Sequence, residues 1–282
     1  MKKNILLLLV LCISHIGISQ EYFPKNDGVK ENNAQYTAFT NATLYVSPSN
    51  KINNATLLIK QGKVIASGKN VTIPSNTVVV DLEGKFIYPS FIDPYTNFGV
   101  KNPERTSGGR RSPQYGASRD GFYWNDHIMP EKNAIDHFTY DSKTAKAMRK
   151  EGFGLVNTHS MDGIARGTGL LVALNDQGNQ AMRIIDDALA QLYSFSKSVT
   201  SRQSYPGSLM GAMALLRQVY HDAHWYEKGN IPTKDRSLEA LLKNKNKVSI
   251  FEAGNKSNNL RAAKIGNQFG INYLIVGGGD EY

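Results

Sequence analysis

Residues 84–97 read GKFIYPSFIDPYTN, and this stretch decides the fold. Its apolar run predicts a buried strand over residues 86–93. Polar side chains stand at the end of that strand and just after it, namely Asp93, Tyr95 and Asn97. Barrel enzymes place their chemistry where strands end, so these three residues are the first candidates for a functional site.

The same stretch resembles the segment G-K-x-x-x-P-G-F-I-D-x-H-x-H of the metal-dependent amidohydrolase superfamily, which includes imidazolonepropionase-like and prolidase-like proteins. In that family the segment leads into the first strand of a (β/α)₈ barrel, and its two histidines bind a catalytic metal. Here Tyr95 and Asn97 stand at those two positions. Phenol and amide groups are poor metal ligands beside imidazole. The resemblance therefore implies an amidohydrolase fold whose metal site is degenerate.

The residues before this stretch have a β pattern. Gln61-Gly62-Lys63 separates two short apolar runs, which predicts a hairpin. Short strands with Gly, Asn and Pro turns predict a small β-sandwich over residues 36–85. This part also resembles the small composite β-domain that precedes amidohydrolase barrels. The expected strands are 38–46, 56–59, 64–66 and 77–81.

The residues after it alternate between strand and helix patterns, which favours a parallel sheet or barrel. We predict an incomplete amidohydrolase-like (β/α) barrel over residues 86–282, with roughly five or six of the eight strands that the fold requires. An open α/β sheet in a complete protein is the alternative. After 86–93 the expected strands are 153–158, 170–174, 248–251 and 273–276, and the expected helices are 142–150, 209–226, 237–243 and 260–269.

The first twenty residues have the pattern of a cleaved signal peptide. Lys2 and Lys3 precede an apolar run over residues 5–13, which is too short for a spanning helix. Residues 21–35 are polar and aperiodic and are expected to be a linker. We therefore expect a periplasmic or secreted protein without a membrane span. Cys12 is the only cysteine and leaves with the signal, so the mature chain has no disulfide and no cysteine metal site.

The formal charge is +9, and arginines cluster in a Gly/Ser-rich stretch over residues 105–119. A basic balance is compatible with nucleic-acid binding. For an exported chain, a soluble basic surface is the better interpretation, and we expect no nucleic-acid partner.

The other strand ends supply few metal ligands. By resemblance, Glu252 and Gly254 stand where the next histidines of the family lie, and Gly277 replaces a further one. His159 follows a strand and could act as an isolated base, although a packed histidine is the competing interpretation. Asp93 matches the family's own aspartate. The competing interpretation is that Asp93 only caps the turn after the strand. His221 and His224 share a helix face without a third ligand.

The resemblance implies an exported, amidohydrolase-like protein that forms the non-catalytic N-terminal part of a larger metal-dependent hydrolase acting on carbon–nitrogen bonds. A downstream amidohydrolase domain of the same polypeptide is the expected partner, and a small molecule or a peptide-derived compound is the expected substrate. We expect no cofactor in this chain. A divalent metal such as zinc is expected only if the family site is intact elsewhere.

Two alternatives remain open. One is an active hydrolase with unusual ligands, drawn from His159, Glu252, Asp93 and Asp280. The other is an envelope module that binds carbohydrate or peptide through the aromatic insertion at residues 105–126. That module would have an aromatic cleft that binds the ligand. The competing interpretation is a loop that only packs its aromatic rings over the barrel mouth. The cleft residues would be Tyr115, Phe122, Tyr123 and Trp124.

Overall fold

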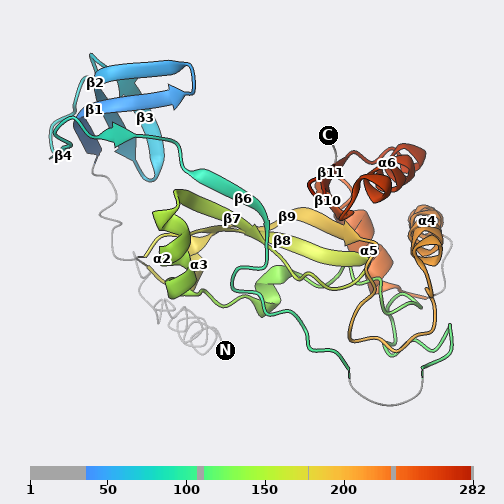
Figure 1. The fold of residues 1–282 in the computed structure, drawn as a ribbon. Coiled ribbons are helices and arrows are strands. Elements are labelled where there is room, and N and C mark those ends of the chain that lie inside the picture. Colours follow the sequence, from blue (N-terminus) through green and yellow to red (C-terminus); the bar gives the residue numbers. More distant parts are fainter. Residues whose placement is uncertain (1–35, 107–110, 177, 230–232, 281–282) are drawn as a thin grey trace, which may run out of the picture. The chain divides into compact units, whose positions relative to one another are not determined.

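The structure is a computed structural model that describes residues 36–106, 111–176, 178–229 and 233–280. The chain divides into two compact units between Pro89 and Ser90 (Figure 1). The predicted signal peptide at 1–20 and the predicted linker at 21–35 lie outside the described residues. None of the described helices combines the length and the apolarity that crossing a membrane requires.

The first unit is a five-stranded sheet of order β3-β2-β1-β4, in which β5 also pairs with β1. Gln61 and Gly62 have φ values of 50° and 72°, the left-handed geometry of a tight hairpin, so the predicted hairpin is confirmed. The described strands of this unit are hydrogen-bonded into one sheet, and their arrangement as a sandwich stays a prediction. The strands are β1 (Thr37–Ser47), β2 (Asn50–Lys60), β3 (Lys63–Gly68), β4 (Val78–Asp81) and β5 (Phe86–Ile87).

The second unit is a mixed α/β structure built on a six-stranded, barrel-like sheet of order β11-β10-β9-β8-β7-β6. Its strands are β6 (Phe91–Thr96), β7 (Phe153–Thr158), β8 (Ala165–Ala173), β9 (Ile184–Ser194), β10 (Val248–Glu252) and β11 (Tyr273–Val276). Its helices are η1 (Ala134–His137), α2 (Ser142–Lys150), α3 (Gln180–Arg183), α4 (Leu209–Glu227), α5 (Arg236–Lys243) and α6 (Lys256–Phe269).

The sequence stretch 86–93 does not form one strand. Phe86 and Ile87 pair with β1 in the first unit, and β6 begins at Phe91 in the second. Pro89 lies between them and ends the first unit. Proline has no backbone N–H to donate to a sheet, which accounts for the break at this point.

The sheet of the second unit is not purely parallel, contrary to the (β/α) alternation that we predicted. β8 runs antiparallel to both β7 and β9. Residues 159–164 join β7 to β8, and a connection this short cannot hold the crossover that parallel neighbours need. The remaining neighbours in the sheet are parallel and are joined by long connections.

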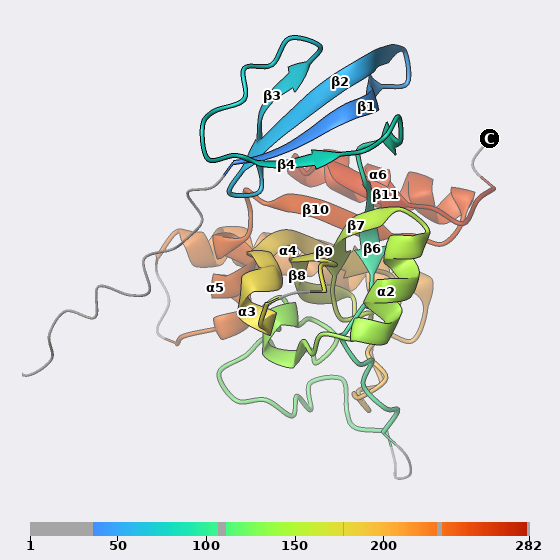
Figure 2. The same cartoon turned by 90° about the vertical axis from the view of Figure 1, so that its left-hand side faces the viewer.

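Each face of this sheet has its own apolar cluster. Tyr193 and Phe251 face the helices α4, α5 and α6, which gather beside β9, β10 and β11 (Figures 1 and 2). On the other face, Leu192 and Ile250 form a smaller cluster. Tyr95 of β6 and Val276 of β11, the two edge strands, both pack against this smaller cluster. The second face is therefore the concave interior of the barrel-like sheet.

Candidate functional site: the barrel mouth

The candidate site lies on the concave face, at the end of the sheet where β6, β7 and β10 finish. β8 is antiparallel to β7, so it begins at this end and brings Arg166 to the mouth. Tyr95 comes from β6 and Glu252 is the last residue of β10. His159 directly follows β7. The fold thus assembles four polar side chains from four strands, at the end of the sheet where barrel enzymes carry their chemistry.

Arg166 is the centre of this group, and only 2 % of its side chain is exposed. Its Nη1 donates to the Tyr95 hydroxyl at 2.8 Å, and its Nη2 donates to Glu252 Oε2 at 2.7 Å. Its Nε donates to the carbonyl of Gly163 at 3.2 Å. The guanidinium therefore bridges the two residues that stand at the metal-ligand positions of the amidohydrolase pattern, Tyr95 and Glu252.

Buried amides hold the backbone at Arg166. Gln191 donates from Nε2 to the Arg166 carbonyl, and Asn244 donates to Gln191 Oε1 at 2.9 Å. Both amide residues are almost fully buried. Such support fixes the direction of the arginine side chain before anything binds at the mouth.

Burial dominates the electrostatics of Tyr95. It raises the pKa of this phenol to about 12, an effect that the Arg166 charge opposes and the Glu252 charge reinforces. The phenol therefore stays protonated at neutral pH and is not an anionic metal ligand.

His159 packs against Tyr95, with ring centroids 4.5 Å apart, and 1 % of the residue is exposed. Burial, helped by the Arg166 charge, lowers its pKa to about 3, so the imidazole is neutral at neutral pH. Neither ring nitrogen has a hydrogen-bond partner among the described residues.

The other predicted candidates make no hydrogen bond to the side chains of this group among the described residues. Asp93 Oδ1 accepts from the Tyr95 N–H at 3.0 Å. Asp93 therefore caps the turn at this point, as the non-catalytic interpretation of this residue expected. Asn97 is exposed. Asp280 Oδ1 accepts from the Lys256 N–H at 3.0 Å, at the start of α6. Gly277 is exposed and has no side chain to offer.

The donor set at the mouth does not fit a divalent metal. A catalytic zinc needs about three protein ligands from imidazole, carboxylate or thiolate groups. The described residues hold no cluster of three or more His, Cys, Asp or Glu side chains with the geometry for a metal. The Glu252 carboxylate is paired with a buried guanidinium.

Sequence reasoning missed Arg166 as a functional residue. Arg166 lies in the segment Gly163–Gly169, a G-x-x-R-G pattern before an apolar run. The available signal was a single arginine at the start of a run whose other residues are apolar or small. A buried arginine needs an anionic partner, and Glu252 was the candidate carboxylate.

A second buried polar cluster contains Asp162, Ser198 and His127. The Ser198 hydroxyl donates to Asp162 Oδ2 at 2.6 Å, and His127 Nδ1 accepts from the Ser198 backbone N–H at 3.0 Å. The serine hydroxyl bonds the carboxylate and not the imidazole, so the cluster does not have the serine–histidine hydrogen bond of a catalytic triad. The cluster ties the segment before β8 to the segment after β9.

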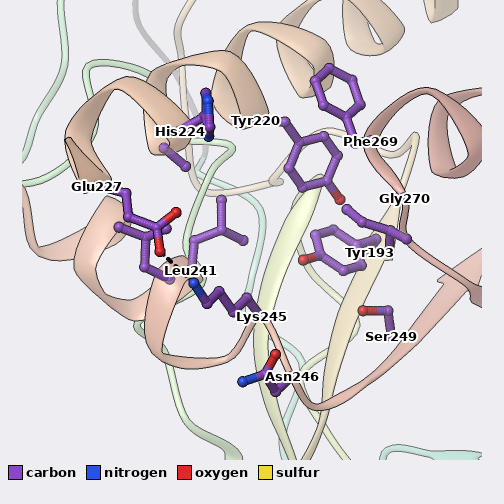
Figure 3. Close-up of a pocket in the computed structure, with 13 residues that line it drawn as sticks. Tyr193, Tyr220, His224, Glu227, Leu241, Lys245, Asn246, Ser249, Phe269 and Gly270 are labelled. Carbon is purple, nitrogen blue, oxygen red and sulfur yellow. Dashed lines mark hydrogen bonds and ion pairs between the residues drawn. The ribbon is translucent and has the colours of Figure 1, made fainter.

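A cavity of about 300 Å³ lies on the helical face of the same unit (Figure 3). Tyr193, Tyr220 and Phe269 form its aromatic wall, and the Glu227–Lys245 ion pair stands at its opposite side. Ser249 and Gly270 place it beside the segments that enter β10 and β11. It is thus on the other face from the mouth and near the strand starts, away from the usual place of barrel chemistry.

The predicted aromatic cleft is formed in part. Tyr115 and Trp124 line a hollow, together with Tyr205, which sequence reasoning did not include. Tyr123 is instead buried in the core and donates from its hydroxyl to Asp222 at 2.6 Å. Phe122 lies against the guanidinium groups of Arg119 and Arg236.

Comparison with known proteins gives structural likenesses. No protein-family model matches the sequence, and the comparison with curated proteins found no match. An amidohydrolase from Thermotoga maritima MSB8 matches with a TM-score of 0.64 and 21 % identity, over 85 % of this chain and 63 % of that one.

Two other solved structures have lower TM-scores. A prolidase complexed with N-methylphosphonate-L-proline has a TM-score of 0.40 and 12 % identity, over 82 % of this chain and 59 % of its own. A beta-aspartyl dipeptidase from Fervidobacterium islandicum AW-1 has a TM-score of 0.33 and 15 % identity, over 85 % and 64 %.

The chain spans about three fifths of the length of these structures. The structural neighbours are members of the amidohydrolase superfamily. An identity of 21 % establishes a shared architecture and not a shared activity. Over the part that it spans, the chain has the fold of an amidohydrolase.

Proposed function

We propose that this chain is a non-catalytic, amidohydrolase-like module of a larger, exported, metal-dependent hydrolase that acts on carbon–nitrogen bonds. One observation carries the proposal: the Arg166 guanidinium lies between Tyr95 and Glu252, at the mouth where the family pattern expects a metal. The signal-like pattern around Lys2 and Lys3 supports export.

The Arg166 guanidinium makes the mouth unfavourable for a metal cation. Arginine keeps its charge at any pH that a folded protein tolerates, so it repels a second cation close by. It also occupies the Glu252 carboxylate with a charge-assisted hydrogen bond. The pair joins β8 to β10 at the mouth. It leaves the neutral His159 imidazole as a single potential ligand, fewer than the three that a catalytic metal needs. The module would then position or bind a substrate for a downstream amidohydrolase domain, and a small molecule or a peptide-derived compound remains the expected substrate.

Metal analysis of the purified chain tests the absence of a site. After incubation with zinc or manganese and dialysis, we expect far less than one equivalent of metal, and no hydrolysis of dipeptides or N-acyl amino acids. Stoichiometric metal that is lost in Glu252→Gln or His159→Gln would support the alternative of an active hydrolase with unusual ligands.

Stability measurement tests the role of Arg166. The Arg166→Met variant removes the charge and keeps an apolar side chain, so Glu252 loses its partner. We expect the free energy of unfolding in urea to fall by about 3 kcal/mol, because an uncompensated, partly buried charge remains. The matched control is Lys234→Met, which breaks the exposed pair with Glu239 and should cost less than about 0.5 kcal/mol. Equal effects in the two variants would contradict a structural role for the guanidinium.

The sequence of a longer polypeptide would test whether a downstream amidohydrolase domain is the partner of this chain. We expect a sequence that continues beyond codon 282 to contain an intact H-x-H segment, and the full protein to bind metal there. Metal bound to residues 1–282 of that full protein would contradict the proposal. The alternative of a ligand-binding module is favoured by the aromatic hollow at Tyr115, Trp124 and Tyr205.

A further inference from the structure

A hollow of about 470 Å³ lies between the loop at residues 114–124, the segment at Tyr205 and helix α4. It is distinct from the barrel mouth and from the cavity in Figure 3, because the three share no lining residue. Its lining residues are Gln114, Tyr115, Trp124, Tyr205, Ala214, Leu215 and Gln218.

Three aromatic rings form a continuous platform in this hollow. The Trp124 and Tyr205 rings are nearly parallel, with 20° between their planes and 6.2 Å between their centroids. Tyr115 lies 5.1 Å from Trp124 at 47°, and 74 % of it is exposed. Tyr115 thus extends the half-buried pair of Trp124 and Tyr205, and the rings offer a large apolar surface to a ligand at little cost in side-chain entropy.

Buried amides fix this platform in advance. Gln203 Nε2 donates to the carbonyls of Trp124 at 2.9 Å and Gln114 at 3.1 Å. Asn125 Nδ2 donates to the Tyr205 carbonyl at 3.0 Å. Gln203 and Asn125 are both almost fully buried. The three segments that carry the rings are therefore held by side-chain hydrogen bonds that a simple surface loop does not need, and such preorganisation reduces the entropic cost of binding.

The polar groups of the hollow are neutral. None of the seven lining residues has a carboxylate or a cationic side chain. The Gln114 side chain is exposed and lines the hollow. Gln218 donates from Nε2 to Asp222 Oδ1 at 2.6 Å, so its carbonyl oxygen is left to accept from a ligand. An amide offers both donors and acceptors, as a hydroxyl does.

We propose that this hollow is a binding site for a neutral carbohydrate. A sugar ring has C–H groups on its faces, which pack on aromatic rings, and hydroxyls at its rim, which match the Gln114 and Gln218 amides. A charged ligand would find no counter-ion among the lining residues. A purely apolar ligand would cover the Gln114 amide and the Gln218 carbonyl oxygen without bonding to them. A proline-rich peptide also packs on aromatic rings, and it is an outcome of the test.

The proposal does not depend on the proposed function, since a carbohydrate site on this loop is compatible with an active or an inactive barrel mouth. Tryptophan fluorescence gives a direct readout. The chain has two tryptophans, Trp124 and Trp225. Trp225 is 55 % exposed on α4, so Trp225→Phe leaves Trp124 as the single reporter with little effect on the fold.

The experiment titrates the Trp225→Phe chain with maltohexaose, cellohexaose and chitohexaose, and checks the affinity of the unmodified chain by calorimetry. We expect a saturable change in Trp124 emission with at least one of these sugars. Tyr115→Ala should weaken binding roughly tenfold, since it removes one stacked ring. Gln218→Ala should weaken it by a smaller factor.

The matched control is Tyr88→Ala, which removes an exposed tyrosine from the first unit and should leave the affinity unchanged. Far-UV circular dichroism confirms that each variant is folded. The proposal is overturned if none of the three sugars gives a saturable change, or if Tyr115→Ala binds as tightly as its parent. Saturation by a decaproline peptide in place of the sugars would also overturn it.

Discussion

The His159 ring is held at the mouth by packing and not by hydrogen bonds to other described residues. Its ring lies against Tyr95, and neither nitrogen has a partner among the described residues. A charged imidazole in this place would be desolvated and close to the Arg166 guanidinium. The imidazole therefore stays neutral and packs as a flat ring in the mouth. It takes up a proton near neutral pH only when the chain is unfolded.

We predict that His159 makes the chain less stable in mild acid. The pKa in the folded chain is about 3, below the value of about 6.5 for an unfolded histidine, so protonation favours unfolding. The stability that the neutral ring contributes is complete above pH 6.5 and is lost as the pH falls from there towards 3. Between pH 7 and pH 5 this loss is about 2 kcal/mol.

The measurement is urea unfolding of wild type and His159→Phe at pH 7 and pH 5. Phenylalanine keeps a ring at this position and does not titrate, so the variant should lose about 2 kcal/mol less than wild type over this interval. His127, whose pKa burial lowers to about 4, contributes with the same sign in both proteins. Identical pH dependence in the two proteins would show that His159 takes up its proton without unfolding.

At the residue level the sequence shows which letters of the family pattern are replaced, but not which side chains meet at the mouth. Tyr95 and Asn97 replace histidines within a recognisable frame, so a degenerate metal pattern is visible in the letters alone. The pairing of Arg166 with Glu252 joins residues 86 positions apart. A contact at that separation depends on the register of β8 and β10, which local pattern does not determine.

At the scale of elements, β8 organises the second unit. It lies in the middle of the sheet and pairs antiparallel with both neighbours. The segment at residues 128–133 runs alongside its start, where Met129 donates from its N–H to the Ala165 carbonyl at 2.7 Å. This close approach is possible because residue 167 is a glycine. A Cβ built on Gly167 would lie 1.0 Å from the Lys132 carbonyl oxygen.

We predict that Gly167→Ala strongly destabilises the chain. The added methyl group would overlap backbone, which cannot move without breaking the contacts between residues 128–133 and β8. We expect a loss of more than about 3 kcal/mol in the free energy of unfolding, or failure to fold. The measurement is thermal and urea unfolding followed by circular dichroism.

The control for this prediction is Gly207→Ala. At Gly207 an added Cβ would meet only the Ser204 carbonyl oxygen, at 3.9 Å, which is ordinary contact. This variant should differ from wild type by less than about 0.5 kcal/mol. A Gly167→Ala protein as stable as the control would mean that the segment 128–133 does not lie on β8.

Among the elements, helices and short apolar strands were predicted well. α2 has the predicted bounds and begins after Asp141, which accepts from the Lys143 and Thr144 N–H groups. α6 ends at the predicted residue 269, before Gly270 with φ of 69°, but it begins four residues before the predicted start. β9 was missed, because Asp186 and Asp187 interrupt its apolar pattern. The direction of β8 was also missed, since it follows from the short connection before it and not from its composition.

At the scale of the whole chain, the six-stranded sheet has two edges. β6 and β11 each pair with one neighbour among the described strands. Both carry exposed apolar side chains, which include Phe91 at 65 % and Leu274 at 59 %. An edge strand presents free backbone donors and acceptors, and apolar side chains there favour pairing with another chain.

We predict that the isolated 282-residue chain self-associates through the β11 edge. Leu274→Lys puts a charge on that edge, which opposes strand pairing, and we expect it to weaken association roughly tenfold. Sedimentation equilibrium over a range of protein concentrations measures the effect. The matched control is Leu260→Lys on α6, where a leucine with 69 % exposure lies off the sheet edge. Equal weakening by both substitutions would assign the association to general surface apolarity, and a wild-type chain that stays monomeric at all concentrations would show that the edge is protected.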